Sequence, residues 1–181
     1  MASRAEILTV GHSNHDEAEF LDLLRGAAVE LLADVRANPR SRYPHFNRSA
    51  LAASLESAGI GYVHLGETLG GRREPTPDSP NVGWEQEFFR GYADHMESDG
   101  FAAGIEGLEG LARDRRTAVM CAEAVWWRCH RRLIADALTV RGWRVLHLMP
   151  DGGLPEHALT EFAVVEDGHI IYPEPQTSLD L

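Results

Sequence analysis

Lysine is missing from this chain of 181 residues, in which arginine supplies all 17 cationic side chains. The protein therefore has no lysine amine for a Schiff base and no lysine for a phosphate-binding P-loop. The 28 acidic residues give a formal net charge of −11. Because nonspecific binding to a nucleic-acid backbone depends on clustered positive charge, this acidity argues against a protein that coats DNA or RNA.

Cysteine and long apolar runs are also scarce. The two cysteines, Cys121 and Cys129, are too few for a disulfide framework, so we expect reduced thiols. No segment reaches the roughly 20 consecutive apolar residues of a membrane span, and no apolar leader precedes the first expected strand. We therefore expect a cytoplasmic protein that does not bind a membrane.

Short apolar runs alternate with segments of helical periodicity along the chain. The expected strands are residues 7–10, 30–35, 61–65, 117–120 and 144–148. The expected helices are one that Ser13 or Asn14 caps and Gly26 ends, followed by residues 49–58, 84–96, 105–113 and 129–141. Short connections between these elements predict an α/β fold, a single domain with a mainly parallel sheet of about five strands and helices on both faces.

Two segments lie outside this alternation. Residues 66–83 contain Gly70-Gly71 and three prolines, which predicts an irregular flap over a site. The core of the domain is expected over residues 7–150, and residues 151–181 form a C-terminal extension. That extension is expected to contain a short helix at 157–162 and a hairpin that turns at Asp167-Gly168.

Residues 121–132 place both cysteines, a carboxylate, a histidine and three arginines within twelve positions. Cys121 follows the fourth expected strand, and Cys129 and His130 fall in the first expected turn of the next helix. A helix N-terminus attracts anions and lowers the pKa of a nearby cysteine. We therefore expect chemistry in this segment, with Cys121 as the reactive thiol.

Polar side chains follow four of the expected strands. These residues are His12 and Ser13 after the first strand, Asp34 and Arg36 after the second, His64 after the third, and Cys121 and Glu123 after the fourth. The carboxyl ends of parallel strands share one edge of a sheet, where ligands bind. We therefore expect one pocket at this edge, lined by His12, Arg36, His64, Cys121 and Glu123.

Arginines cluster after the second strand, in a loop without acidic residues. Arg36, Arg40, Arg42 and Arg48 fall within thirteen positions. The planar guanidinium group suits phosphate and carboxylate, so this loop predicts an anion site that includes Ser41, Phe46 and Asn47. Ordinary solvated loop charge is the alternative.

Several short motifs occur together and in order. They are Gly11-His12-Ser13, Asp34-Val35-Arg36, Pro39-Arg40-Ser41, Phe46-Asn47, Leu65-Gly66, and Cys121-Ala122-Glu123 followed by Cys129-His130-Arg131. As a set, over about residues 7–150, they resemble the family called domain of unknown function 488 (DUF488). The resemblance implies a fold and a group of site residues, among them Arg131 as an anion contact, but it implies no established reaction.

Each site residue has a functional and a structural interpretation. Cys121 is a nucleophile or a small core residue; Glu123 is a general acid or base, which requires burial, or a helix cap. His64 is the preferred histidine for proton transfer. Asp34 and Arg36 orient each other at the site or form a structural ion pair, and His12 with Ser13 bind phosphate or cap the first helix.

The residues together predict a hydrolase or group transferase for a phosphorylated or otherwise anionic substrate, such as a nucleotide or a nucleic-acid derivative. No dinucleotide-binding or Walker motif is present, so no cofactor is expected. Two alternatives remain open. One is a zinc or iron site built from Cys121, Cys129 and His130 with His64 or Glu123, although the spacing differs from paired ligand motifs. The other is a non-catalytic module that binds a ligand or nucleic acid in the same groove.

Overall fold

Five parallel strands form the centre of the protein, which a computed structural model describes over residues 5–176. The strands are β1 (Glu6–Gly11), β2 (Leu31–Asp34), β3 (Gly61–His64), β4 (Thr117–Cys121) and β5 (Arg144–Leu148). Their order across the sheet is β3-β2-β4-β1-β5, and every neighbouring pair is parallel. The predicted α/β class is therefore confirmed, including the number and direction of the strands.

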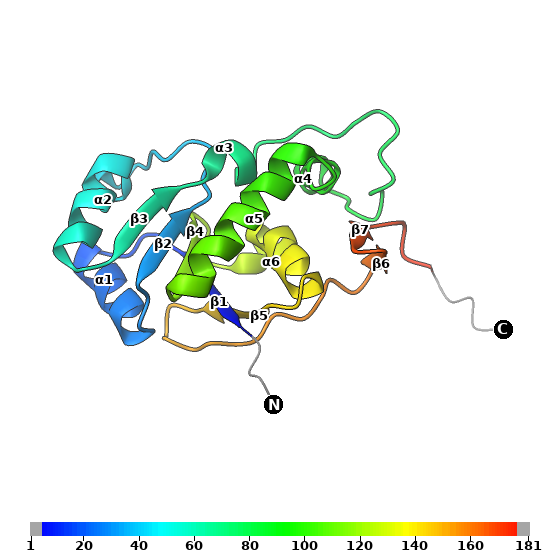
Figure 1. Ribbon diagram of the computed structural model, residues 1–181. Helices are drawn as coiled ribbons and strands as arrows, with labels where there is room; N and C mark the ends of the chain where they lie inside the picture. Colours follow the sequence, from blue (N-terminus) through cyan, green and yellow to red (C-terminus); the bar gives the residue numbers. More distant parts are fainter. Residues whose placement is uncertain (1–4, 177–181) are drawn as a thin grey trace.

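Helices cover both faces of this sheet, as predicted (Figure 1). α1 (Glu17–Gly26) and α2 (Arg48–Ser57) contribute to the core on one face, together with Leu8 and Val10 of β1. The other face is covered by α3 (Gly66–Leu69), α4 (Glu87–His95), α5 (Asp99–Asp114) and α6 (Arg131–Val140). Because successive side chains of a strand point to opposite faces, Ile7 belongs to this second core and Leu8 to the first.

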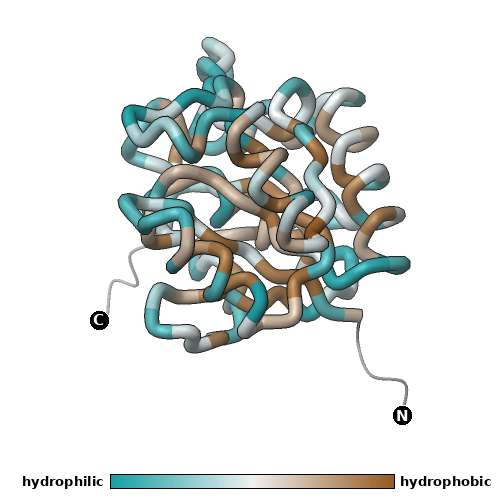
Figure 2. The backbone as a smooth tube through the Cα atoms, turned by 90° about the vertical axis from the view of Figure 1, so that its left-hand side faces the viewer, coloured by the Kyte–Doolittle hydropathy of each residue, from teal (hydrophilic) through white to brown (hydrophobic). Residues whose placement is uncertain are grey.

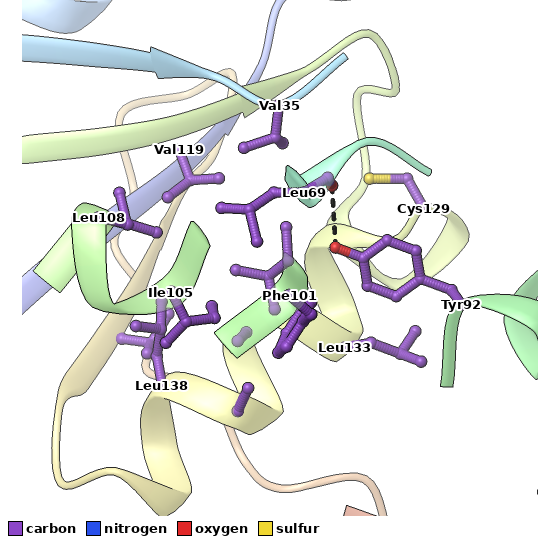
Figure 3. Packing of buried hydrophobic residues seen from close by; sticks show 14 of the residues in the cluster. Val35, Leu69, Tyr92, Phe101, Ile105, Leu108, Val119, Cys129, Leu133 and Leu138 are labelled. Carbon is purple, nitrogen blue, oxygen red and sulfur yellow. Dashed lines mark hydrogen bonds between the residues drawn. The ribbon is translucent and has the colours of Figure 1, made fainter. Parts of the chain in front are cut away.

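Hydrophobic residues are concentrated in the interior of the fold, as the colouring of the backbone by hydropathy shows (Figure 2). The larger of the two cores contains Leu69, Tyr92, Leu133 and Cys129, which lie close together (Figure 3). The hydroxyl of Tyr92 donates a hydrogen bond of 2.9 Å to the carbonyl oxygen of Leu69. This packing fixes α3 and α4 beside the segment that carries Cys129.

Four helices begin two or more residues from their predicted starts, namely α4 at Glu87 instead of 84, α6 at Arg131 instead of 129, and α1 and α5. Ser13 has a φ of 46°, outside the extended range of an N-cap, and α1 instead follows Asp16, whose N–H lies 3.4 Å from the Glu19 carboxylate. α5 begins six residues earlier than expected, after Ser98, which accepts from the N–H of Phe101. The sequence pattern did not indicate a helix here because Gly100 and Gly104, in the first turns of α5, are poor helix formers. Gly104 is nevertheless required, because a Cβ at this position would collide with the side chain of Thr68.

The flap and the C-terminal extension also differ in part. Residues 66–83 begin with α3, so they are not irregular throughout. The helix predicted at 157–162 is wrong, because the backbone N–H of His157 binds Val145 and that of Thr160 binds the Asp136 carboxylate. The predicted hairpin is confirmed as β6 (Val164–Glu166) and β7 (His169–Ile171).

The last five residues of the extension, 177–181, lie outside the described part of the chain. No helix within residues 5–176 combines the length and the apolar character that a membrane crossing requires.

Candidate active site

Two cysteine sulfurs meet at the carboxyl edge of the sheet. Cys121 is the last residue of β4, and a turn of 3-10 helix, η2 (Trp126–Arg128), brings the chain back so that Cys129 lies beside it. The two Sγ atoms are 2.7 Å apart, and both residues are buried, at 3% and 5% exposure. Cys129 was expected inside the helix, but α6 begins only at Arg131.

Arg131 places a buried positive charge against this pair. Its side chain is 1% exposed. Its Nε donates to Cys121 Sγ at 3.0 Å and to Cys129 Sγ at 3.3 Å, while its two terminal nitrogens reach Thr9 Oγ1 and the Glu123 carbonyl. No carboxylate among residues 5–176 forms an ion pair with it. A buried charge needs an opposite partner, and the sulfurs are the groups that can supply one.

The surroundings of the pair favour a thiolate at Cys129. Burial opposes its ionisation, but hydrogen bonding from Cys121 and the neighbouring His130 and Arg131 groups outweigh burial and hold the pKa of Cys129 well below its usual value. The N–H of Arg131, at the start of α6, also points to Cys129 Sγ at 3.3 Å. Burial, together with the hydrogen bond and the charge of Cys129, raises the pKa of Cys121 well above its usual value, so these surroundings do not favour the thiolate predicted at Cys121.

Both cysteines lie in the lining of an open cleft of about 460 Å³. Its lining includes Cys121, Cys129, His130, Glu123 and Phe88, together with Arg36, Arg40, Arg72 and Arg128. A neighbouring pocket shares Arg40 and Glu123 with this cleft and also includes His12 and Ser13. The two are separate pockets that adjoin each other at the carboxyl edge of the strands.

Arg36 is already occupied by a carboxylate. Its Nε and one terminal nitrogen donate to the two oxygens of Asp34 at 2.9 and 2.7 Å, and the other terminal nitrogen donates to the carbonyl oxygen of Phe46. Asp34 also accepts from the hydroxyl of Tyr62 at 2.7 Å. The pair is therefore a buried structural ion pair, of which Arg36 lines the cleft and Asp34 does not.

The two histidines expected in a single pocket with the cysteines lie elsewhere. His12 stacks on Phe46 at 4.2 Å and lines the neighbouring pocket; burial and the charge of Arg36 lower its pKa to about 4, so it is neutral at pH 7. His64 Nε2 lies 2.8 Å from the backbone oxygen of Arg36, and His64 is not part of the cleft lining. The prediction of one pocket is correct for Arg36, Cys121 and Glu123 and wrong for these histidines.

Glu123 reaches the cleft as an exposed side chain. Its backbone oxygen, and not its carboxylate, accepts from Arg131 at 2.6 Å. This close approach requires Gly11, because a Cβ at that position would overlap with the same oxygen. Glu123 therefore lacks the burial expected of a general acid. Among the described residues that line the cleft, it is the one with a carboxylate side chain.

The arginine loop contributes Arg40 to the cleft, in addition to Arg36, which is paired with Asp34. Asn47 accepts from the N–H of Ser41, and Ser41 Oγ accepts from the N–H of Tyr43, so these side chains shape the loop. Arg42 lies over the ring of Tyr43 at 5.0 Å and lines only the neighbouring pocket. Arg40 is exposed and lines both.

Sequence reasoning missed Arg72 and Arg128, which come from separate segments. Both are exposed, line the cleft, and have no side-chain hydrogen bond or ion pair within residues 5–176. Gly71 precedes Arg72 and packs so closely on His130 that a Cβ would reach within 2.5 Å of its Nδ1. The Gly70-Gly71 pair was the signal that the flap approaches the site.

A buried chain of polar residues behind Arg131 was also missed. Thr9, His147, His157 and Asp136 are linked in sequence by contacts of 2.7, 3.0 and 2.7 Å. Burial lowers the pKa of His147 to about 2, so its ring is neutral. Every group in this chain is satisfied when each residue donates a hydrogen bond to the next. Arg131 then donates to Thr9, Thr9 to His147, His147 to His157, and His157 to Asp136.

The ligand set of the metal alternative is incompatible with this arrangement. No group of three or more His, Cys, Asp or Glu side chains within residues 5–176 is placed to hold a metal ion, and the Arg131 guanidinium occupies the space beside both sulfurs. His130 Nε2 is directed to the carbonyl oxygen of Val35 at 3.1 Å.

We therefore predict that the protein requires no stoichiometric metal. Elemental analysis of protein purified without an affinity tag is expected to find neither zinc nor iron in proportion to the chain. One zinc or iron ion per chain, lost in the Cys129→Ala variant, would contradict this result and favour the metal alternative.

Comparison with known proteins adds a family but no activity. The family model described as Domain of unknown function DUF488 matches residues 17–138, more than half of the chain. The matched segment includes both cysteines and Arg131. No curated protein and no solved structure gives a significant match.

Proposed function

The chain belongs to the DUF488 family, and we propose that it is a hydrolase or group transferase that uses the Cys129 thiolate on an anionic substrate. The observation that carries the proposal is the buried Arg131 guanidinium, which contacts two sulfurs and no carboxylate. A thiolate is the nucleophilic form of cysteine, and an adjacent fixed cation is a usual means of stabilising it. A purely structural core cysteine has no need of such a partner.

Three exposed arginines supply the substrate preference. Arg40, Arg72 and Arg128 line the cleft from three different segments, in a chain that is acidic as a whole. Guanidinium groups bind phosphate and carboxylate in a bidentate manner. Their convergence on the cysteine cleft supports a phosphorylated or carboxylated substrate, and the exposed ring of Phe88 adds a surface for a planar group such as a nucleobase.

The chemistry consists of two displacement steps. Cys129 Sγ forms a bond to the electrophilic phosphorus or carbonyl carbon, and the bond from that atom to the leaving oxygen breaks. The leaving oxygen takes a proton from solvent, and Glu123 at the rim of the cleft is the carboxylate available to accept the proton of the attacking water or hydroxyl in the second step. Water, or an acceptor hydroxyl in a transferase, then attacks the same atom, and the thiolate of Cys129 is released.

Binding of an anion to this cleft is directly testable. Phosphate binds only the folded protein, so it should raise the thermal midpoint more than chloride of equal ionic strength. The Arg72→Ala Arg128→Ala variant should lose most of this phosphate-specific rise, because it removes two of the three free cations at the cleft. Differential scanning fluorimetry over a phosphate series measures the effect.

The matched control is Arg25→Ala Arg113→Ala, which removes the same charge from exposed positions that do not line the cleft. It should keep the phosphate-specific rise. Equal losses in the two double variants would show that phosphate responds to net charge, and the cleft would not be the anion site.

A non-catalytic binding module would use the same cleft and would pass that test. The two functions separate at Cys129→Ser, assayed with p-nitrophenyl phosphate and p-nitrophenyl acetate as reporters of phosphoryl and acyl transfer. The enzyme is expected to turn over one reporter and to lose that turnover in Cys129→Ser, with phosphate binding retained. Turnover that is unchanged in this variant would contradict a role for the thiolate.

A further inference from the structure

Two sulfurs in direct contact can undergo a reaction that neither hydrolysis nor group transfer uses. The Sγ atoms of Cys121 and Cys129 lie 2.7 Å apart, closer than a non-bonded sulfur contact, and no other side chain separates them. A disulfide bond is about 2.05 Å long, so closure needs a shift of well under 1 Å. Both residues line the open cleft, which a small oxidant can enter.

The two thiols are also different from each other. Cys129 accepts from the N–H of Arg131 and lies at the start of α6, whereas Cys121 Sγ is directed to the Glu123 carbonyl at 3.9 Å, an acceptor that favours a protonated thiol. The Arg131 Nε is within 3.3 Å of both sulfurs. The Cys129 sulfur is therefore placed to react with an oxidant as a thiolate, and the neighbouring Cys121 sulfur is a protonated thiol.

We propose that peroxide oxidises Cys129 to a sulfenic acid and that Cys121 resolves it to a reversible disulfide. In the first step the Cys129 thiolate attacks one peroxide oxygen, the O–O bond breaks, and the departing hydroxide takes a proton to become water. In the second step the Cys121 sulfur, losing its proton, attacks Cys129 Sγ and the S–O bond breaks to release a second water. Two thiols are oxidised by two electrons and one hydrogen peroxide is reduced.

The consequence for the proposed function is a redox switch. The disulfide removes the nucleophile, so turnover stops, and a dithiol reductant restores it. The inference rests on the proposed function in one respect, namely that Cys129 is the reactive thiolate. It adds a substrate class, small peroxides, and a role for Cys121 that substrate turnover does not require.

The chain is well suited to a test because it contains only these two cysteines. Reduced protein is treated with a small excess of hydrogen peroxide and quenched by alkylation of the remaining thiols, and the cross-linked peptide is identified by mass spectrometry. We expect a Cys121–Cys129 disulfide that dithiothreitol reverses. In Cys121→Ser we expect a sulfenic acid on Cys129, trapped by dimedone, and in Cys129→Ser an oxidation of Cys121 that is about tenfold slower or more.

The double variant Cys121→Ser Cys129→Ser serves as the blank, and circular dichroism confirms that each variant is folded. Over-oxidised Cys129 without a cross-link in the wild-type protein would overturn the inference, and so would equal oxidation rates for the two single variants. The detection of the disulfide in the wild-type protein does not depend on whether any variant folds. If Cys129 is alkylated rapidly but peroxide forms no disulfide, only this inference fails; if Cys129 is inert to both reagents, the proposed function fails with it.

Discussion

Replacing Arg131 with methionine is expected to lower the free energy of unfolding by about 3–5 kcal/mol and to raise the pKa of Cys129. The guanidinium is 1% exposed and is the charged partner of the two sulfurs, so its loss leaves a thiolate buried without a counter-charge. The sulfur then takes up a proton. Reactivity of Cys129 with iodoacetamide at pH 7 should fall about tenfold for each unit by which its pKa comes to lie above 7.

Urea unfolding and timed alkylation measure the two effects of Arg131→Met. Arg25→Met is the matched control, because Arg25 is 52% exposed and its pair with Asp22 is worth no more than about 1 kcal/mol. Arg131→Lys keeps the charge without the planar fork and should fall between the wild type and Arg131→Met. Unchanged alkylation of Cys129 in Arg131→Met would show that the guanidinium does not stabilise a thiolate.

The second large effect is expected at Asp136, at the far end of the polar chain behind Arg131. This buried carboxylate accepts from His157 at 2.7 Å, from the N–H of Thr160 at 3.0 Å and from the hydroxyl of Tyr172 at 2.7 Å. Asp136→Ala leaves these groups without a partner and should cost about 3–5 kcal/mol. For a domain of this size, that cost corresponds to a fall in thermal midpoint of roughly 6–20 °C.

Asp22→Ala is the control for this loss of a carboxylate, because Asp22 is 78% exposed and should change the midpoint little. A midpoint of Asp136→Ala equal to that of the control would show that the C-terminal extension contributes nothing through this network. The network also explains why residues after 150 are part of the domain: His157 and Tyr172 are both buried against Asp136.

The sequence predicted the sheet well because its strands are short apolar runs between glycine-rich and polar connections. All five lie within one residue of their expected ends, and the carboxyl edge presents Asp34, Arg36, Cys121 and Glu123 as expected. The order β3-β2-β4-β1-β5 was not predicted, because the alternation of strands and helices indicates that the strands are parallel but not which strands are neighbours.

The charge state of the site was predicted less well, because it depends on contacts between distant segments. Spacing alone placed Cys129 within a helix, but the turn at η2 returns it to Cys121 before α6 begins. Arg72 enters the cleft only because Gly71 lets the flap pack on His130. Arg36, in contrast, was expected to bind the substrate, and a carboxylate two residues away already occupies it.

The central claim is that Cys129 carries a thiolate in the folded protein, and its alkylation as a function of pH tests this most directly. The reduced protein is treated with iodoacetamide between pH 4 and 9, and each cysteine is quantified by peptide mass spectrometry. Because the pKa of Cys129 is lowered, its rate should reach a plateau well below the pKa of about 8.5 of a free thiol, and added phosphate should slow it. Cys121 should remain unmodified until the pH is higher or the protein unfolds. Alkylation of Cys121 before Cys129, or of neither cysteine until the protein unfolds, would contradict the account.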